Sequence, residues 1–129
     1  MVDRVVVTQA ASALIAKLQA RHGDLLFHQS GGCCDGSAPM CDPRREFRTG
    51  AQDVFLGTIS GAPFFIGAAQ FEYWRHTQLI IDVVQGRGGG FSLEAPEGVR
   101  FLTRGRVFTD EETAELRAAG EPPNGAMLE

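Results

Sequence analysis

The chain has 129 residues, of which 43% are hydrophobic and 22% are charged, and its net charge is −4. These values are typical of one soluble domain with a real core, and no apolar run approaches the ~20 residues that span a bilayer. With 12 basic and 16 acidic side chains, nucleic-acid binding is also disfavoured. The start "MVDRVVVTQ" has no basic segment followed by an apolar signal region, so we expect a cytoplasmic protein.

The N-terminal residues predict a short strand followed by a helix. Residues Arg4 to Val7 are mostly β-branched, and Thr8 can cap a helix by accepting a hydrogen bond from an otherwise unpaired amide. Apolar residues then follow the i, i+3, i+4, i+7 spacing of a buried helical stripe, namely Ala11, Leu14, Ile15 and Leu18. The sequence "RHG" ends this helix, because glycine suits the left-handed cap.

The middle of the chain predicts strands. "DLLFHQS" enters a long loop rich in glycine, proline and cysteine, and "VFLGTIS" and "PFFIGAAQFEYW" predict two further strands around a turn at Gly61 and Ala62. "TQLIIDVV" and "VRFLTRGRVF" predict another two strands. Most of the aromatic residues in "FEYW" suit a core; the alternative for Tyr73 or Trp74 is a homodimer surface.

A second helix is predicted near the C-terminus. Thr109 and Glu112 form the spacing of a capping box, and this helix should end by Gly120. Helix, several short strands and helix in this order predict an α+β domain with a mixed or antiparallel β-sheet, an N-terminal helix and a short C-terminal helix. We expect one globular domain over residues 1–120 and a loosely ordered tail over residues 121–129.

All three cysteines lie in the sequence "FHQSGGCCDGSAPMCDP", at Cys33, Cys34 and Cys41. In a reducing cytoplasm, clustered thiols indicate metal binding or redox chemistry more often than a structural disulfide. Thiolates bind zinc, copper(I) and iron–sulfur clusters, and the surrounding glycines allow the backbone to curl around an ion. The chain has no C-x-x-C pair, however, and adjacent cysteines project in different directions in extended chain.

His28 is the first auxiliary candidate for a metal ligand, followed by Met40 as a soft ligand and Asp42 as an oxygen ligand. The alternative for His28 is a hydrogen-bonded core histidine, because it stands inside a predicted strand. His22 suits a helix end, and His76 could reach the site only if the sheet brings it there.

The sequence "VTQAASALIAKLQARHGDLLFHQSGGCCDGSAPMC" resembles the start of the bacterial domain of unknown function 779 family, and the similarity continues through "QFEYWRHTQLIIDVVQGRGGGFSLEAPEGVRF". Genes of such families often stand beside aldehyde dehydrogenase genes. The resemblance therefore implies a role in aldehyde or alcohol metabolism, with an aldehyde dehydrogenase as the expected partner.

A more distant resemblance links the helix, the strand and "SGGCCDGS" to the HesB-like A-type iron–sulfur carriers, and "TQLIIDVVQGRGGGFSLEAP" is similar to a later segment of those proteins. It implies a HesB-like fold with Cys33 or Cys34 at the first ligand position. Those carriers have a Cys-Gly-Cys motif near the C-terminus, whereas this chain has no cysteine after Cys41. A shared fold is therefore better supported than a shared carrier function.

These observations favour a cytoplasmic thiolate-based metal-binding protein, and the family resemblance implies that it serves aldehyde or alcohol oxidation as an accessory factor. The expected ligands are Cys33, Cys34, Cys41 and His28. The expected cofactor is a transition metal ion, which could be zinc, copper or iron, and the iron could belong to an iron–sulfur cluster. Two alternatives stay open. One is a thiol redox enzyme in which one cysteine attacks and another resolves, and the other is a metal-free module that regulates an aldehyde dehydrogenase.

Overall fold

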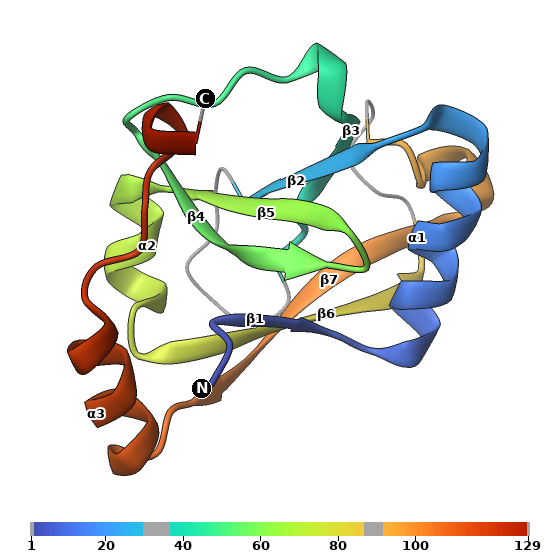
Figure 1. The fold of residues 1–129 in the computed structure, drawn as a ribbon. Helices are drawn as coiled ribbons and strands as arrows, with labels where there is room; N and C mark the ends of the chain where they lie inside the picture. Colours follow the sequence, from blue (N-terminus) through green and yellow to red (C-terminus); the bar gives the residue numbers. More distant parts are fainter. Residues whose placement is uncertain (1, 30–36, 87–91, 129) are drawn as a thin grey trace.

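The computed structural model describes residues 2–29, 37–86 and 92–128. Within these residues the chain forms two sheets and three α-helices (Figure 1), which confirms the predicted α+β class. The helices are α1 (Gln9–His22), α2 (Ala68–Trp74) and α3 (Asp110–Ala119). The strands are β1 (Val5–Val7), β2 (Leu25–Gln29), β3 (Met40–Pro43), β4 (Asp53–Ile59), β5 (Ala62–Gly67), β6 (Thr77–Gln85) and β7 (Val99–Val107).

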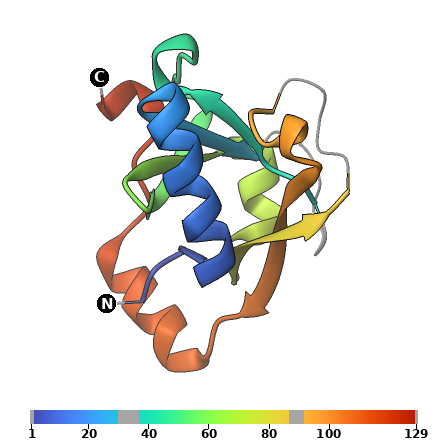
Figure 2. The same ribbon diagram turned by 90° about the vertical axis from the view of Figure 1, so that its right-hand side faces the viewer.

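Both sheets are mixed. One has the strand order β1-β6-β7, in which β1 is parallel to β6 and β6 is antiparallel to β7. The other has the order β3-β2-β5-β4, in which β2 is parallel to β5, and the outer strands β3 and β4 are antiparallel to their neighbours. Figures 1 and 2 show α1 lying across one end of the strands, and α2 and α3 lie on the opposite side of the molecule in Figure 1.

The two sheets and α1 enclose one hydrophobic cluster. Its largest fully buried members come from both sheets and the helix, including Phe27, Phe64, Phe101, Ile15 and Ile81. Phe27 stacks on Phe64, with 6.1 Å between ring centroids, and meets Phe101 edge-on at 5.0 Å. Aromatic pairs of this kind stabilise a core beyond the area that they bury.

The ends of both long helices follow from their local sequence, as predicted. The Thr8 side chain accepts a hydrogen bond from the Ala11 amide, and α1 ends at Gly23, whose φ of 79° favours glycine. At α3, Thr109 and Glu112 form both hydrogen bonds of the capping box. These contacts satisfy amides and carbonyls that a helix end leaves without intrahelical partners.

Two predictions about the middle of the chain are wrong. The second half of "PFFIGAAQFEYW" forms α2 and not a strand, because Phe71 and Trp74 lie three residues apart and bury one helical face. The end of the cysteine loop, predicted to be irregular, forms the edge strand β3, which pairs with β2. Trp74 is therefore a core residue with 3% of its surface exposed, whereas Tyr73 on the same helix is 68% exposed.

The segment expected to form a loosely ordered tail packs along β4. The Phe55 amide donates to the Pro123 carbonyl oxygen at 2.8 Å, and Asn124 makes an isolated bridge with Val54. A short 3-10 helix, Gly125–Leu128, follows. None of the helices in the described residues has the length and apolarity needed to cross a membrane.

Candidate functional site

His28 lies in the middle of its sheet, on β2, with Met40 of β3 on one side and Phe65 of β5 on the other. Its side chain is nearly buried, and its Nε2 atom lies 2.6 Å from Oδ1 of Asp53. The Phe47 ring packs beside the imidazole at a centroid distance of 5.1 Å. Two contacts from outside β2 therefore hold the imidazole in a defined orientation.

Asp53 reaches His28 across an intervening strand. It is the first residue of β4, which is separated from β2 by β5, and it stands opposite Gly67. Because residues two apart in a strand share a face, Gly67 lies on the same face as Phe65 and hence as His28. Glycine has no side chain to fill the space between the imidazole and the carboxylate, so the two groups can meet over β5.

A tight turn fixes the Asp53 carboxylate. The Gly50 amide donates to Oδ2 at 2.8 Å, and the Asp53 amide donates to the Gly50 carbonyl oxygen at 3.1 Å. One carboxylate oxygen is thus held by the backbone and the other by His28. A carboxylate that orients an imidazole in this way recurs in catalytic sites, and it recurs behind metal-bound histidines.

The pair borders an open hollow of about 450 Å³. Its other lining residues belong to the turn before β4 and to the start of α2, namely Gln52, Gly67, Ala68, Ala69 and Gln70. The Ala68 amide donates to the Gln52 carbonyl oxygen at 2.8 Å, which joins the two segments. The hollow has room for an ion with its ligands or for a small molecule.

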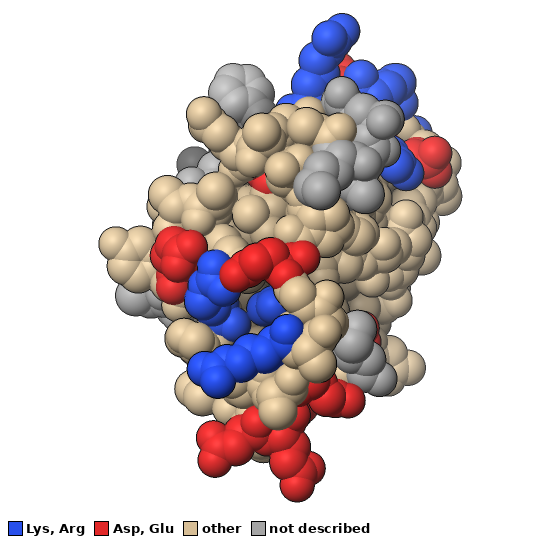
Figure 3. Space-filling model, turned by 60° about the vertical axis from the view of Figure 1, so that its left-hand side comes forward, with Lys and Arg blue, Asp and Glu red and all other residues tan. Residues whose placement is uncertain are grey.

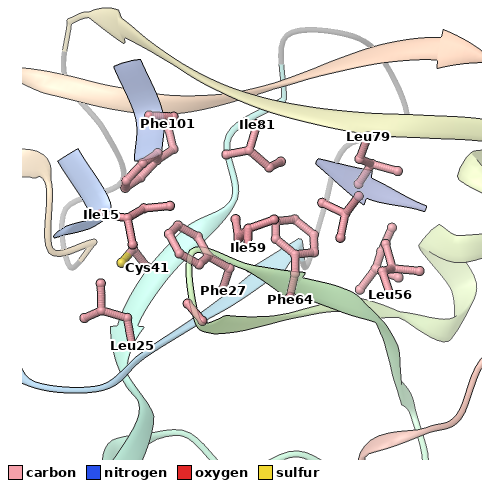
Figure 4. Packing of buried hydrophobic residues seen from close by; sticks show 14 of the residues in the cluster. Ile15, Leu25, Phe27, Cys41, Leu56, Ile59, Phe64, Leu79, Ile81 and Phe101 are labelled. Atoms are coloured by element: carbon pink, nitrogen blue, oxygen red, sulfur yellow. The ribbon is translucent and has the colours of Figure 1, made fainter. Parts of the chain in front are cut away.

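Cys41 lies on the other face of the sheet. It stands opposite Phe27 in the β2–β3 register, one residue away from the His28–Met40 pair, so the pleat directs it into the core. Figure 4 shows its sulfur among Ile15, Leu25 and Phe27, and none of its surface is exposed. Cys41 and His28, two of the predicted ligands, therefore lie on opposite faces of the sheet and do not meet.

The surroundings of Cys41 keep its thiol protonated. Burial raises the pKa of the Cys41 thiol well above its ordinary value, and the negative charges of Glu94 and Asp42 raise it further. Its backbone is held as well, because its amide donates to Ser92 Oγ at 2.9 Å and its carbonyl oxygen accepts from the Leu93 amide at 3.0 Å. A buried, protonated thiol is a poor nucleophile and a poor ligand.

Cys33 and Cys34 lie outside the described residues, so their convergence with Cys41 stays a prediction. Met40 shares the face of His28, and Asp42 is half-buried on that face two residues further along β3. Burial raises the pKa of Asp42, Glu46 raises it further, and His28 lowers it. Among the residues that the structure describes, no group of three histidine, cysteine, aspartate or glutamate side chains could hold a metal ion.

The remaining histidines lie elsewhere. His22 is in the last turn of α1, and the carbonyl oxygen of His22 accepts a hydrogen bond from Arg45 at 3.1 Å. His76 is exposed between α2 and β6, where it lines a different hollow from the one beside His28.

Sequence reasoning missed Asp53 and the buried acid Glu94. No sequence signal joins Asp53 to His28, because they stand 25 residues apart and meet only through the strand order. Glu94 is fully buried, accepts from the Ser92 hydroxyl and from the Phe101 amide at 3.1 Å, and so ties the segment before β7 to the core. The first glutamate in "FSLEAPEG" resembles any exposed loop residue until these donors are known.

The family model described as "Domain of unknown function (DUF779)" matches residues 14–107, and the chain belongs to this family. The match covers β2, β3, β4 and β5, and so includes His28, Asp53 and the cysteine-rich stretch. A search of the curated proteins found no match.

Proposed function

We propose that this DUF779 protein binds a transition metal ion through His28, Cys33 and Cys34. The observation that carries the proposal is the His28–Asp53 pair, whose 2.6 Å contact orients an imidazole at the edge of an open hollow. Metal-bound histidines are oriented by a carboxylate or carbonyl in this manner, and the outer partner increases the basicity of the ligand. Asp53 is thus the orienting group in the proposal.

The chain connectivity supports this ligand set. Cys33 follows His28 by five residues, and five residues of extended chain span at most roughly 18 Å. Cys33 and Cys34 are therefore close enough to His28 along the chain for the three residues to be proposed as ligands of one ion. One nitrogen and two sulfur ligands suit zinc, copper(I) or iron.

The buried Cys41 is left out of the proposed ligand set. It faces the core on the opposite side of the sheet from His28, and burial raises the pKa of its thiol. We assign it a packing role, as a small hydrophobic residue against Phe27. The same burial weighs against Cys41 as the resolving thiol of a redox enzyme, so that alternative would require Cys33 and Cys34 to act together.

The cellular role in the proposal is that of a cytoplasmic accessory factor in aldehyde or alcohol oxidation, with an aldehyde dehydrogenase as its partner. This part rests on the family resemblance alone. A metal-free regulatory module for the same kind of enzyme is the competing proposal.

Elemental analysis of the freshly isolated protein, followed by zinc, copper(I) and iron(II) titration of the stripped protein, tests the proposal. We expect stoichiometric metal in the wild type and loss of metal in His28→Ala, Cys33→Ser and Cys34→Ser. Asp53→Asn should weaken metal affinity by about 10- to 100-fold, because the imidazole loses its orienting carboxylate. His22→Ala, a histidine on α1, is the matched control and should keep full affinity.

Metal affinity should also weaken at acidic pH, because a proton competes with the ion for the imidazole. A wild-type protein that is isolated without metal and takes up none of the three metals would contradict the proposal, as would unchanged affinity in the folded His28→Ala variant.

A further inference from the structure

Three arginines from distant parts of the sequence line one hollow on the face opposite α1. Arg4 precedes β1, Arg75 follows α2, and Arg117 lies in the last turn of α3. We call this hollow of about 260 Å³ the arginine pocket, and Phe108 and Leu116 supply apolar parts of its lining. Figure 3 shows the basic side chains gathered in a depression, with acidic side chains bordering it above and below.

A buried aromatic ring holds two of these guanidinium groups in place. The Cζ atom of Arg4 lies 5.3 Å from the ring centroid of Phe71, and that of Arg75 lies 4.8 Å from it. Phe71 is 4% exposed and belongs to the core. Guanidinium groups stack well on aromatic rings, so these two charges are positioned without a ligand.

The charges in the arginine pocket do not balance. Its described lining includes one carboxylate, that of Glu121, which lies 2.8 Å from Arg75, and Glu72 of α2 also pairs with Arg75 at 3.2 Å, so two carboxylates face three guanidinium groups. Neither Arg4 nor Arg117 has a carboxylate within ion-pair distance in the described part of the chain. In a protein of net charge −4, such a local excess of positive charge attracts anions.

Arg4 is the most constrained of the three. It is half-buried, and its side chain donates to the Arg75 carbonyl oxygen at 3.4 Å. Burial lowers the pKa of the Arg4 guanidinium, the Glu121 carboxylate raises it, and the Arg75 guanidinium lowers it. An anion placed between Arg4 and Arg117 would offset both the burial and the repulsion between like charges.

We propose that the arginine pocket binds a small organic anion with one oxyanion head group and a short apolar body. The head group contacts Arg4 and Arg117, and the apolar body packs against Phe108 and Leu116. The volume of about 260 Å³ equals that of roughly nine water molecules, which suits an anion of roughly ten non-hydrogen atoms or fewer. This site is independent of the proposed metal site.

Glu121 makes the proposal testable in both directions. Its side chain is 69% exposed, and its carboxylate occupies Arg75 from the edge of the arginine pocket. Its negative charge also acts on the Arg4 guanidinium, so it opposes an anion that approaches Arg4. Removing its charge should strengthen anion binding, whereas removing a guanidinium should weaken it.

The experiment titrates inorganic phosphate and, separately, butyrate into the full chain and follows the backbone amide signals of Thr113 and Gly120 by NMR at constant ionic strength. We expect a saturable change with at least one of the two anions and none with chloride. Arg4→Gln and Arg117→Gln should each weaken binding about tenfold or more, since hydrogen bonds to charged groups are the strong ones. Glu121→Gln should tighten binding about threefold or more.

Arg48→Gln is the matched control, because it removes one exposed positive charge that lines a different hollow. It should leave the binding constant unchanged. Arg117 is exposed on α3, so its variant tests the site even if Arg4→Gln fails to fold. The proposal is overturned if neither anion gives a saturable change, if chloride reproduces the change, or if Arg117→Gln binds as tightly as the wild type.

Discussion

Replacing Cys33 and Cys34 by serine leaves Cys41 as the single thiol of the chain, and this variant measures how well the fold protects it. Cys41 has no exposed surface, and both its amide and its carbonyl oxygen are hydrogen-bonded to residues 92 and 93. A thiol reagent can reach the sulfur only after β3 separates from β2 and from this segment. We therefore expect labelling of native Cys41 to require extensive opening of the fold.

The expected protection follows from the free energy of that opening. Small domains unfold with about 5–15 kcal/mol, and each 1.4 kcal/mol changes a population tenfold. At the lower end of this range, labelling of the native protein should be about 4 × 10³-fold slower than labelling of the denatured chain. The raised pKa of the thiol slows the native reaction further, because the thiolate is the reactive form.

The assay follows the release of the chromophore from a disulfide reagent at pH 8, in buffer and in denaturant. An exposed reference thiol comes from Ala20→Cys on α1 in a variant without the three native cysteines, and it should react within seconds to minutes under both conditions. A native Cys41 that reacts less than about a hundredfold more slowly than in the denatured chain would refute this reasoning. That result would return Cys41 to the set of candidate metal ligands and resolving thiols.

Two further predictions concern acidic residues outside the proposed metal site. Glu94→Ala leaves two buried donors without their acceptor and should lower the free energy of unfolding by about 3–5 kcal/mol. At about 4 °C per kcal/mol for this chain length, calorimetry should show a Tm that is lower by about 10–20 °C. A decrease in Tm of less than about 4 °C would contradict the role of Glu94 as the acceptor of both bonds. Arg106 and the Thr109 amide lower the pKa of Glu112 to about 2, so this carboxylate stabilises the fold above its unfolded-state pKa of about 4.3 and loses the effect as the pH falls through about 2. The Tm difference between wild type and Glu112→Gln should accordingly be present at pH 7 and vanish near pH 2, and a difference that is the same at both pH values would show that the ion pair contributes nothing.

The sequence alone determined the parts of the fold that depend on neighbouring residues. Thr8 and Thr109 predict the starts of α1 and α3, and Gly23 and Gly120 predict their ends, because each cap is formed by residues a few positions apart. The apolar stripe of α1 is equally local. α2 was missed because it has only seven residues and is rich in aromatic side chains, which are also common in strands.

For the candidate site, the sequence predicted His28 and the thiols as ligands but could not give their arrangement. In a strand, a shift of one residue changes the face of every side chain. The register that pairs Phe27 with Cys41 and His28 with Met40 separates the thiol from the imidazole, and only the tertiary structure contains it. The strand order likewise exists only in the tertiary structure. It places Asp53 within reach of His28, with Gly67 of β5 lying between them.

The arginine pocket depends most completely on tertiary structure. Arg4, Arg75 and Arg117 are scattered over the whole chain, and in the sequence each resembles a solvated surface charge. Packing of α2 and α3 on the same side of the sheets brings them to one hollow and places Phe71 beneath two of them. Helix caps and periodicity arise from hydrogen bonds within one segment, whereas the convergence of distant side chains depends on how all the segments pack.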